Sequence, residues 1–240
     1  MALLKADRLI KVYGKRTVVN GVTFEVYPGE IVGLLGPNGA GKTTSFRMTV
    51  GMVRPTGGKV YFKSTDITRM PMYQRARQGM GYLSQESSIF RRLTVEQNVM
   101  AIVEMEKVPR RDRRRVVEEA LDELEIARLA KSRADTLSGG EKRRLEITRA
   151  LVSHPSLLLL DEPFAGVDPI AVQDIQSIVT SLKERGIGVL LTDHNVRETL
   201  AITDRSYIIA HGQILKHGSP DELIHDPDVR RVYLGDSFSI

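Results

Sequence analysis

Residues Gly36-Pro37-Asn38-Gly39-Ala40-Gly41-Lys42-Thr43 fit the phosphate-loop pattern, in which four residues separate two glycines and Lys-Thr follows. An apolar run at residues 31–35 precedes them and indicates a buried strand, and helical spacing follows to about Gly51. Glycines let successive backbone N–H groups point at phosphate oxygens, and a helix start adds its positive dipole end. Lys42 would then reach the β- and γ-phosphates, while the Thr43 hydroxyl holds Mg²⁺. We predict a nucleoside triphosphate site; the alternative is a glycine-rich turn that only caps a helix.

The composition is that of an ordinary globular protein. Of 240 residues, 41% are hydrophobic and 27% are charged, and the net charge is +5. No uncharged apolar stretch approaches the roughly 18 residues typical of a transmembrane helix, and the N-terminus lacks the layout of a secretory signal. Because the chain contains no cysteine, disulfides and thiolate metal sites are excluded. We expect a cytoplasmic protein.

Positive charge is densest in residues 107–115, where six basic residues accompany Asp112. A solvated linker and helix start is the simplest interpretation. Contact with anionic lipid or with nucleic acid is the alternative. No aromatic residue interleaves the run, which argues against a stacking platform for single strands.

Strand and helix signals alternate along the chain. Thr94 and Gln97 form a plausible capping box at the start of a helical region, which predicts a helical insertion over about residues 86–153. The alternation predicts an α/β fold with a mainly parallel core sheet and an antiparallel β subdomain near the N-terminus. The expected strands are residues 3–12, 22–27, 31–35, 59–62, 81–85, 157–160, 187–192, 206–210 and 213–217, and later helices span about 141–153 and 170–184.

Two further predicted strands end in residues suited to chemistry, Asp161-Glu162 and Asp193-His194. In open α/β sheets, ligands bind at the carboxyl ends of the strands. Asp161 follows four leucines, where a carboxylate is costly to bury unless it is paired or holds a metal, so it fits a Mg²⁺ ligand. Glu162 could orient or deprotonate an attacking water; a simple helix cap is the alternative for the pair. His194 either packs against its neighbours or serves the site.

Taken together, these motifs resemble the ATP-binding subunits of ABC transporters. The resemblance spans almost the whole chain, and its Leu-Ser-Gly-Gly signature is highly specific to this family. It implies a phosphate-loop NTPase core of the RecA-like type and ATP hydrolysis coupled to transport. The residues that carry it are Tyr13, Gly36–Thr43, Gln85, Leu137-Ser138-Gly139-Gly140-Glu141, Leu157–Glu162, Gly166-Val167-Asp168 and His194.

The resemblance also implies a role for each matched residue. Glu162 would be the catalytic base, His194 a γ-phosphate-sensing switch, and Gln85 a sensor that also touches Mg²⁺. Tyr13 would stack on adenine, and Asp168 would communicate across a dimer. The implied ATP-binding residues are Tyr13, Gly36, Pro37, Asn38, Gly39, Ala40, Gly41, Lys42, Thr43 and Thr44, with Ser138, Gly139 and Gly140 supplied by the opposite subunit. The implied Mg²⁺ ligands are Thr43, Gln85 and Asp161.

A second copy of the chain is an expected partner on physical grounds as well. The helix start at Ser138–Gly140 is a second anion-binding site, which is redundant in one monomer. It makes sense as the other half of a twofold, head-to-tail nucleotide sandwich. ATP would hold the two copies together, and hydrolysis would let them part.

Within the family, four stretches look like the ATPases of lipopolysaccharide-export machines. That resemblance implies two integral-membrane subunits contacted through a groove at Phe90 and Arg91, no direct contact with the cargo, and a place on the cytoplasmic face of the inner membrane. Phe90 in a polar loop is consistent with an interface anchor, or it tucks under its own helical insertion. The four stretches are Gln85–Leu93, Asp161–Pro169, Thr192–Leu200 and Arg231–Asp236.

Some positions depart from that pattern, namely Ser84, Lys142, Lys107–Arg115 and Ser237–Ile240. The ATPases of branched-chain amino-acid importers are the nearest alternative, since they share much of the same sequence pattern, including Tyr233-Leu234-Gly235. Soluble ABC proteins that act on DNA or ribosomes usually carry two cassettes or a long coiled coil. This chain has one phosphate loop and one signature, so we expect no nucleic-acid partner.

Overall fold

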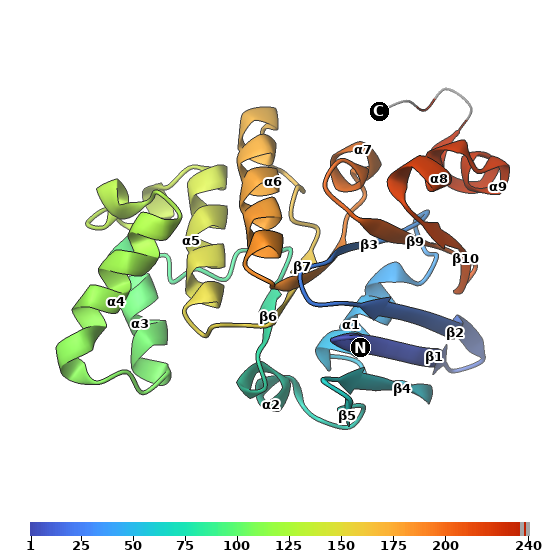
Figure 1. Ribbon diagram of the computed structural model, residues 1–240, viewed down its shortest axis with the longest axis horizontal. Coiled ribbons are helices and arrows are strands. Elements are labelled where there is room, and N and C mark those ends of the chain that lie inside the picture. The colour runs from blue at the N-terminus through green and yellow to red at the C-terminus, as the bar shows by residue number, and fades with distance from the viewer. Residues whose placement is uncertain (236–237, 239–240) are drawn as a thin grey trace.

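The computed structural model describes residues 1–235 and 238, and in them the strands form two sheets (Figure 1). The larger sheet has the order β10-β9-β3-β8-β7-β6, and the smaller has the order β2-β1-β4-β5. Of the C-terminal positions singled out in the sequence, Asp236, Ser237, Ser239 and Ile240 lie outside the described residues. The strands are β1 Leu4–Tyr13, β2 Arg16–Val26, β3 Ile31–Leu35, β4 Gly57–Phe62, β5 Thr65–Asp66, β6 Met80–Leu83, β7 Leu157–Asp161, β8 Gly188–Thr192, β9 Arg205–Ala210 and β10 Gln213–Gly218.

The larger sheet is mainly parallel, as predicted. β3 pairs in parallel with β8 and β9, and β7 pairs in parallel with β6 and β8. β10 runs antiparallel to β9 as its hairpin partner. β3, β7 and β8 are buried along their whole length, which explains why they read as unbroken apolar runs rather than as alternating ones.

The smaller sheet is the predicted antiparallel β subdomain. β1 pairs with β2 on one side and with β4 on the other. β2 begins at Arg16 rather than near Val22, because a tight turn pairs Arg16 directly with Tyr13. Register shifts between β1 and β2 interrupt the alternation of apolar residues, so the first part of β2 carried no clear strand signal.

The helices are α1 Lys42–Val50, α2 Met72–Arg77, α3 Val95–Met105, α4 Arg110–Glu123, α5 Gly139–Leu151, α6 Pro169–Glu184, α7 Val196–Leu200, α8 Pro220–His225 and α9 Pro227–Val229. Short η1 Ala127–Leu129, η2 Ala134–Thr136 and η3 Arg230–Leu234 accompany them. The predicted capping box of α3 is confirmed: the Thr94 hydroxyl accepts from the Gln97 amide, and the Gln97 side chain accepts from the Thr94 amide. In the described part of the chain, no helix has the length and apolar character needed to cross a membrane.

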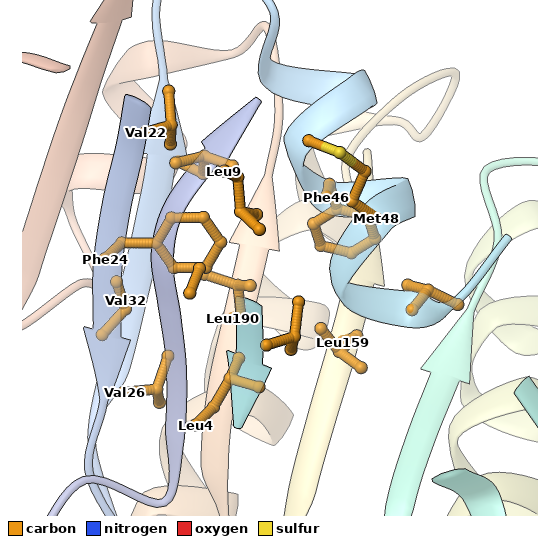
Figure 2. Packing of buried hydrophobic residues seen from close by; sticks show 14 of the residues in the cluster. Leu4, Leu9, Val22, Phe24, Val26, Val32, Phe46, Met48, Leu159 and Leu190 are labelled. Atoms are coloured by element: carbon orange, nitrogen blue, oxygen red, sulfur yellow. The ribbon is translucent and has the colours of Figure 1, made fainter. Parts of the chain in front are cut away.

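One hydrophobic cluster packs α1 between the two sheets (Figure 2). In this cluster, Leu9 and Phe24 come from the small sheet, and Phe46 and Met48 of α1 lie opposite them. Leu159, from β7, belongs to the same cluster. Each large side chain buried in this way contributes about 1.5–3 kcal/mol. The cluster therefore fixes the helix that follows the phosphate loop relative to the large sheet.

α1 ends against a buried guanidinium. Arg75 of α2 is 2% exposed and donates hydrogen bonds to four backbone carbonyls, those of Met48, Thr49, Thr68 and Met70. Two of these carbonyls lie in the last turn of α1, so the cation faces the negative end of that helix dipole. Burial lowers the pKa of Arg75 to about 10, which leaves it charged at neutral pH. α2 was not predicted from the sequence. Its buried residue is Arg75, and its apolar residues do not recur at the spacing typical of a helix.

We expect Arg75→Met to lower the free energy of unfolding by about 2–4 kcal/mol. Several charge-assisted hydrogen bonds are lost, and relief of the buried charge offsets only part of that loss. Urea unfolding followed by circular dichroism measures the change. Arg77→Met, at an exposed position of the same helix, is the matched control and should stay within about 0.5 kcal/mol. Equal losses in both variants would contradict a special role for the buried guanidinium.

Candidate active site

Parallel neighbours bring four loops to one edge of the large sheet. β3, β8, β7 and β6 lie side by side in that order and run in parallel. The phosphate loop follows β3, and His194 follows β8. Glu162 follows β7, and Gln85 follows β6. The sequence-predicted catalytic residues thus meet at the carboxyl edge, where open α/β sheets bind ligands.

The phosphate loop needs glycine where neighbouring strands approach it. Gly36 has φ +142°, and a Cβ there would come within 2.0 Å of the Ile209 carbonyl oxygen. Gly41 has φ +105°, and a Cβ there would come within 2.8 Å of the Val18 carbonyl oxygen. The loop is therefore enclosed by β9 on one side and β2 on the other, and its backbone can follow a path that other residues rarely adopt.

Lys42 is the cation of the phosphate loop. Its Nζ folds back over the loop and donates to the carbonyls of Gly36 and Pro37, the latter at 3.0 Å. Burial lowers the pKa of Lys42, and the nearby Glu162 carboxylate opposes that effect. Thr43 is exposed and Thr44 is half-buried in the first turn of α1. The loop thus presents an ammonium group and two hydroxyls at a helix start.

Asp161 is a buried carboxylate at the end of β7. The Tyr82 hydroxyl donates to its Oδ2 at 3.4 Å. Burial raises the pKa of Asp161, although the Arg47 guanidinium lowers it in part. Arg47 lies four residues after Thr43, so both side chains are on the same face of α1. A carboxylate whose charged form is disfavoured by burial gains most from a cation placed beside it.

The oxygen donors at this edge fit Mg²⁺. A carboxylate from Asp161, a hydroxyl from Thr43 and an amide from Gln85 are hard ligands of the kind this ion prefers. Across residues 1–235 and 238, no group of three or more Cys, His, Asp or Glu side chains is arranged to hold a metal by itself. Mg²⁺ suits such a site, because it commonly uses one or two carboxylates together with substrate phosphates and water.

Glu162 is the centre of the predicted catalytic group. Gln85 donates from Nε2 to Glu162 Oε2 at 2.8 Å, and His194 Nδ1 lies 3.3 Å from the same oxygen. Glu162 has φ +47°, an uncommon backbone conformation for a non-glycine residue. Its backbone N–H donates to the Thr192 carbonyl at 2.7 Å, which holds it there. The side chain is 27% exposed, so solvent water can reach it.

Asp193 joins the loops that carry Glu162 and His194. Its buried carboxylate accepts from the backbone N–H of Phe164 at 2.9 Å and from that of Asn195 at 2.8 Å. Burial raises the pKa of Asp193, and these two hydrogen bonds oppose the rise. From the sequence, Asp193 was singled out only as the neighbour of His194. Its signal was the same as that of Asp161, an acid at the end of a fully buried strand.

The signature residues form a second helix start, at α5. Ser138 caps α5 through a capping box with Glu141, and Gly140 packs so closely on α6 that a Cβ would lie 2.8 Å from Ala171 Cβ. A cavity of about 500 Å³ opens here between α5 and α6, and its lining includes Ser138, Gly140, Glu141, Arg144, Asp168 and Ile170. Asp168 therefore shares a surface with the signature, while the phosphate loop lies against β2 and β9.

The remaining predicted contact residues lie at the surface. Tyr13 is about half exposed, with Lys11 Nζ 4.9 Å from its ring centroid. Phe90 is 45% exposed, with the Arg149 guanidinium 4.6 Å from its ring centroid, so its ring is only partly covered. Arg91 beside it is exposed.

Acidic neighbours pair with much of the basic run that leads into α4. Three of its arginines form ion pairs with glutamates of α3 and α4, the pairs being Arg113–Glu104, Arg114–Glu118 and Arg115–Glu119. These contacts support the simplest interpretation of the run, a solvated helix start.

Comparison with protein families gives a match to the family model described as ABC transporter, over residues 19–165. A Rhizobium meliloti protein described as an uncharacterized ABC transporter ATP-binding protein is 57% identical, covering 99% of this chain and 88% of its own length. The lipopolysaccharide export system ATP-binding protein LptB of Haemophilus influenzae is 52% identical over 100% of both chains.

Solved structures are similar across nearly the whole chain. An ATP-binding cassette of an ABC transporter in its ADP conformation superposes with a TM-score of 0.87 at 29% identity, covering 98% of this chain and all of the other. A dimeric ATP-binding cassette in a post-hydrolysis state, bound to ADP and phosphate, has a TM-score of 0.78 at 25% identity. That match covers 90% of this chain and 98% of the other.

Proposed function

The chain belongs to the family of ABC transporter ATP-binding proteins, and from this premise we propose that it drives the export of lipopolysaccharide from a membrane. As a member of that family, it hydrolyses ATP, and the hydrolysis is coupled to transport. The observation that carries the proposed cargo is the identity of 52%, over the full length of both chains, with a protein named for lipopolysaccharide export.

We assign hydrolysis to Glu162, Gln85 and His194. Glu162 accepts a proton from the water that attacks the γ-phosphorus, while the bond to the β–γ bridging oxygen breaks and ADP leaves. Gln85 Nε2 and His194 Nδ1 contact the same Glu162 oxygen, at 2.8 and 3.3 Å, and these two contacts restrict the orientation of the carboxylate. Lys42 releases the loop carbonyls and binds the β- and γ-phosphates instead. Their grouping at one sheet edge supports these roles.

Thr43, Asp161 and Gln85 would hold Mg²⁺ next to the phosphates. When bound, the ion would supply positive charge that offsets the charge on the phosphate oxygens during transfer. Burial raises the pKa of Asp161, and this supports the assignment because a cation placed nearby favours the ionised form of a buried carboxylate.

A second copy of the chain completes each ATP site. Ser138, Gly139 and Gly140 at the start of α5 would bind the γ-phosphate of ATP held by the partner subunit, and Asp168 lines the same cavity. The dimeric, ADP-bound relative supports this arrangement. Tyr13 would stack on the adenine from its exposed position at the end of β1.

We further propose that residues of about 86–153 act as a helical subdomain within a single ATP-binding domain. A separate hydrophobic cluster of residues between Ile89 and Val152 supports this division.

Phe90 and Arg91 would contact two integral-membrane subunits, and the ATPase would then lie on the cytoplasmic face of the inner membrane. It would touch neither the cargo nor nucleic acid.

Affinity purification from detergent-solubilised membranes, with mass spectrometry of the bound proteins and lipids, tests this proposal. The expected result is two membrane subunits with large periplasmic domains and co-purified lipopolysaccharide. Permeases accompanied by a periplasmic amino-acid-binding protein would instead assign the chain to the branched-chain amino-acid importers. Those importers share the sequence Tyr233-Leu234-Gly235 near the C-terminus. Recovery with nucleic acid in the soluble fraction would overturn the transport role.

The same purification tests the proposed contact at Phe90. We expect Phe90→Ala to reduce recovery of the membrane subunits by about tenfold, since a buried aromatic anchor commonly contributes at least 1–2 kcal/mol at an interface. Met105→Ala is the matched control, because Met105 is an exposed apolar residue at the far end of α3. Equal recovery with both variants would place the membrane contact elsewhere.

A further inference from the structure

The loop of residues 84–90, called here the Gln85 loop, connects the catalytic edge to the helical insertion. It begins after β6, and its Gln85 side chain donates to Glu162. At its other end, the Phe90 backbone N–H donates to the Asn98 side-chain oxygen at 2.8 Å, and the Asn98 amide donates to the Phe90 carbonyl at 3.1 Å. The loop is thus fixed to α3 at one end and reaches the proposed base at the other.

A buried ion pair on α5 forms hydrogen bonds with the backbone of the Gln85 loop. Arg143 and Glu146 are one turn apart, with Nη1 and Oε2 3.0 Å apart, and their side chains are 7% and 5% exposed. Arg143 Nη1 also donates to the Ser84 carbonyl at 3.1 Å. Glu146 Oε1 accepts from the Ser88 backbone N–H at 2.9 Å. One ion pair therefore binds the loop backbone both before and after Gln85.

A third residue of α5 extends the same contact. Arg149 lies three residues beyond Glu146, on the same side of the helix. Its Nη1 donates to the Ser88 carbonyl at 2.7 Å, and its guanidinium lies over the Phe90 ring. One side of α5 therefore contacts the Gln85 loop from Ser84 to the exposed ring of Phe90.

Stability alone does not account for the Arg143–Glu146 pair. Burying two charges costs several kcal/mol per ion, and apolar residues of similar volume are often as stable or more stable. In the described part of the chain, Arg143 Nε and Nη2 are buried without a hydrogen-bond partner, which adds to that cost. What the pair provides is directional contact with two backbone groups of the loop, which apolar side chains cannot make.

We propose that Arg143 and Glu146 are positioning residues that make the Gln85 loop move as one body with α5. The inference rests on the proposed function, in which α5 begins at the contact with the partner subunit's nucleotide and Phe90 contacts the membrane subunits. A shift of α5 on dimer closure then carries Gln85 relative to Glu162, and carries Phe90 with it. The ion pair couples the nucleotide contact, the catalytic edge and the membrane contact mechanically.

The test compares the Glu162→Gln chain with and without the double substitution Arg143→Met/Glu146→Met. Amide hydrogen exchange at Ser88 is measured with and without Mg-ATP, and light scattering on the same samples reports dimer formation. With the ion pair present, we expect Mg-ATP to slow exchange at Ser88 by about tenfold. Without it, we expect Ser88 to exchange at nearly the same rate with or without Mg-ATP, although the dimer still forms.

The matched control is Arg115→Met/Glu119→Met, which removes an exposed ion pair of α4 and should leave the exchange response intact. Arg143→Lys keeps the charge and a donor, so it should retain most of the response. In chains that carry Glu162, the double Met variant should lower kcat by about tenfold with little change in KM, because the phosphate loop is untouched. If thermal unfolding shows that the double variant does not fold, Glu146→Gln replaces it, with an expected loss of about threefold in the response.

Two results would overturn the inference, and they differ from each other. A Ser88 response to Mg-ATP that persists in a dimer lacking the ion pair would refute the coupling while leaving the ATP sandwich intact. A Glu162→Gln chain that stays monomeric with Mg-ATP would refute the sandwich itself, and the coupling with it.

Discussion

Lys42→Ala is expected to abolish measurable nucleotide binding. In the proposed site, the Lys42 ammonium is the charge that the loop would supply to the β- and γ-phosphates, and it already lies within the loop, bonded to the Gly36 and Pro37 carbonyls. Contacts between charged groups in such sites are roughly twice as strong as neutral ones. We expect the dissociation constant for ATP to rise by about two to three orders of magnitude, a loss of about 3–4 kcal/mol.

Titration with a fluorescent ATP analogue measures this change. Lys59→Ala is the matched control: Lys59 is an exposed lysine of β4 paired with Asp66, and its loss should leave the affinity unchanged. Circular dichroism should show the same fold in both variants, which separates a lost contact from a collapsed loop. Unchanged affinity in Lys42→Ala would refute the assignment of the phosphate loop.

Glu162→Gln should lower kcat by about a thousandfold and trap a dimer when Mg-ATP is added. General base catalysis contributes about 10²–10⁴-fold, and an amide of the same shape cannot accept the proton from water. The substituted side chain can still accept from Gln85 and lie beside His194, so the geometry is kept. It also removes a negative charge beside the phosphates, which favours the ATP-bound state.

Light scattering with saturating Mg-ATP detects the dimer, and release of phosphate gives the rate. Glu184→Gln is the control, because Glu184 is an exposed residue at the end of α6 and its loss should change neither measurement. A Glu162→Gln chain that hydrolyses ATP at the normal rate would show that another group accepts the proton.

The sequence predicted the arrangement of the site because its signals are local. An acid or amide at the end of a buried apolar run marks the carboxyl end of a strand, and parallel strands bring such ends together. This is why Asp161, Glu162 and His194 were expected at one sheet edge with the phosphate loop, whereas the role of Gln85 was implied only by the resemblance to ABC transporter ATP-binding subunits. The capping box at Thr94 was equally local, since its two partners are three residues apart.

Element boundaries near the signature and the Gln85 loop were less accurate. The helix expected from about Glu141 begins at Gly139, because Ser138 caps it and the two glycines continue it. The strand expected over residues 81–85 ends at Leu83, since the Ser84 carbonyl bonds to Arg143 instead of continuing the sheet. In both places the boundary depends on a hydrogen bond that the spacing of apolar residues does not predict.

Buried polar contacts between distant segments could not be predicted. Arg75 lies in a run of polar residues, and only the fold places it against the end of α1. The Arg143–Glu146 pair has the spacing of any surface ion pair on a helix, so nothing in the sequence separates it from the exposed pairs of α4. Its burial depends on how the Gln85 loop folds over α5.

The place of β3 in the large sheet has a consequence for how the chain is made. β3 and the phosphate loop come early in the sequence, yet both neighbours of β3, namely β8 and β9, come near its end. Gly36 is enclosed by the backbone at Ile209, which the ribosome adds only after most of the chain has emerged. The nucleotide site is therefore completed last, so a partly synthesised chain has the phosphate-loop sequence without the shape that binds ATP.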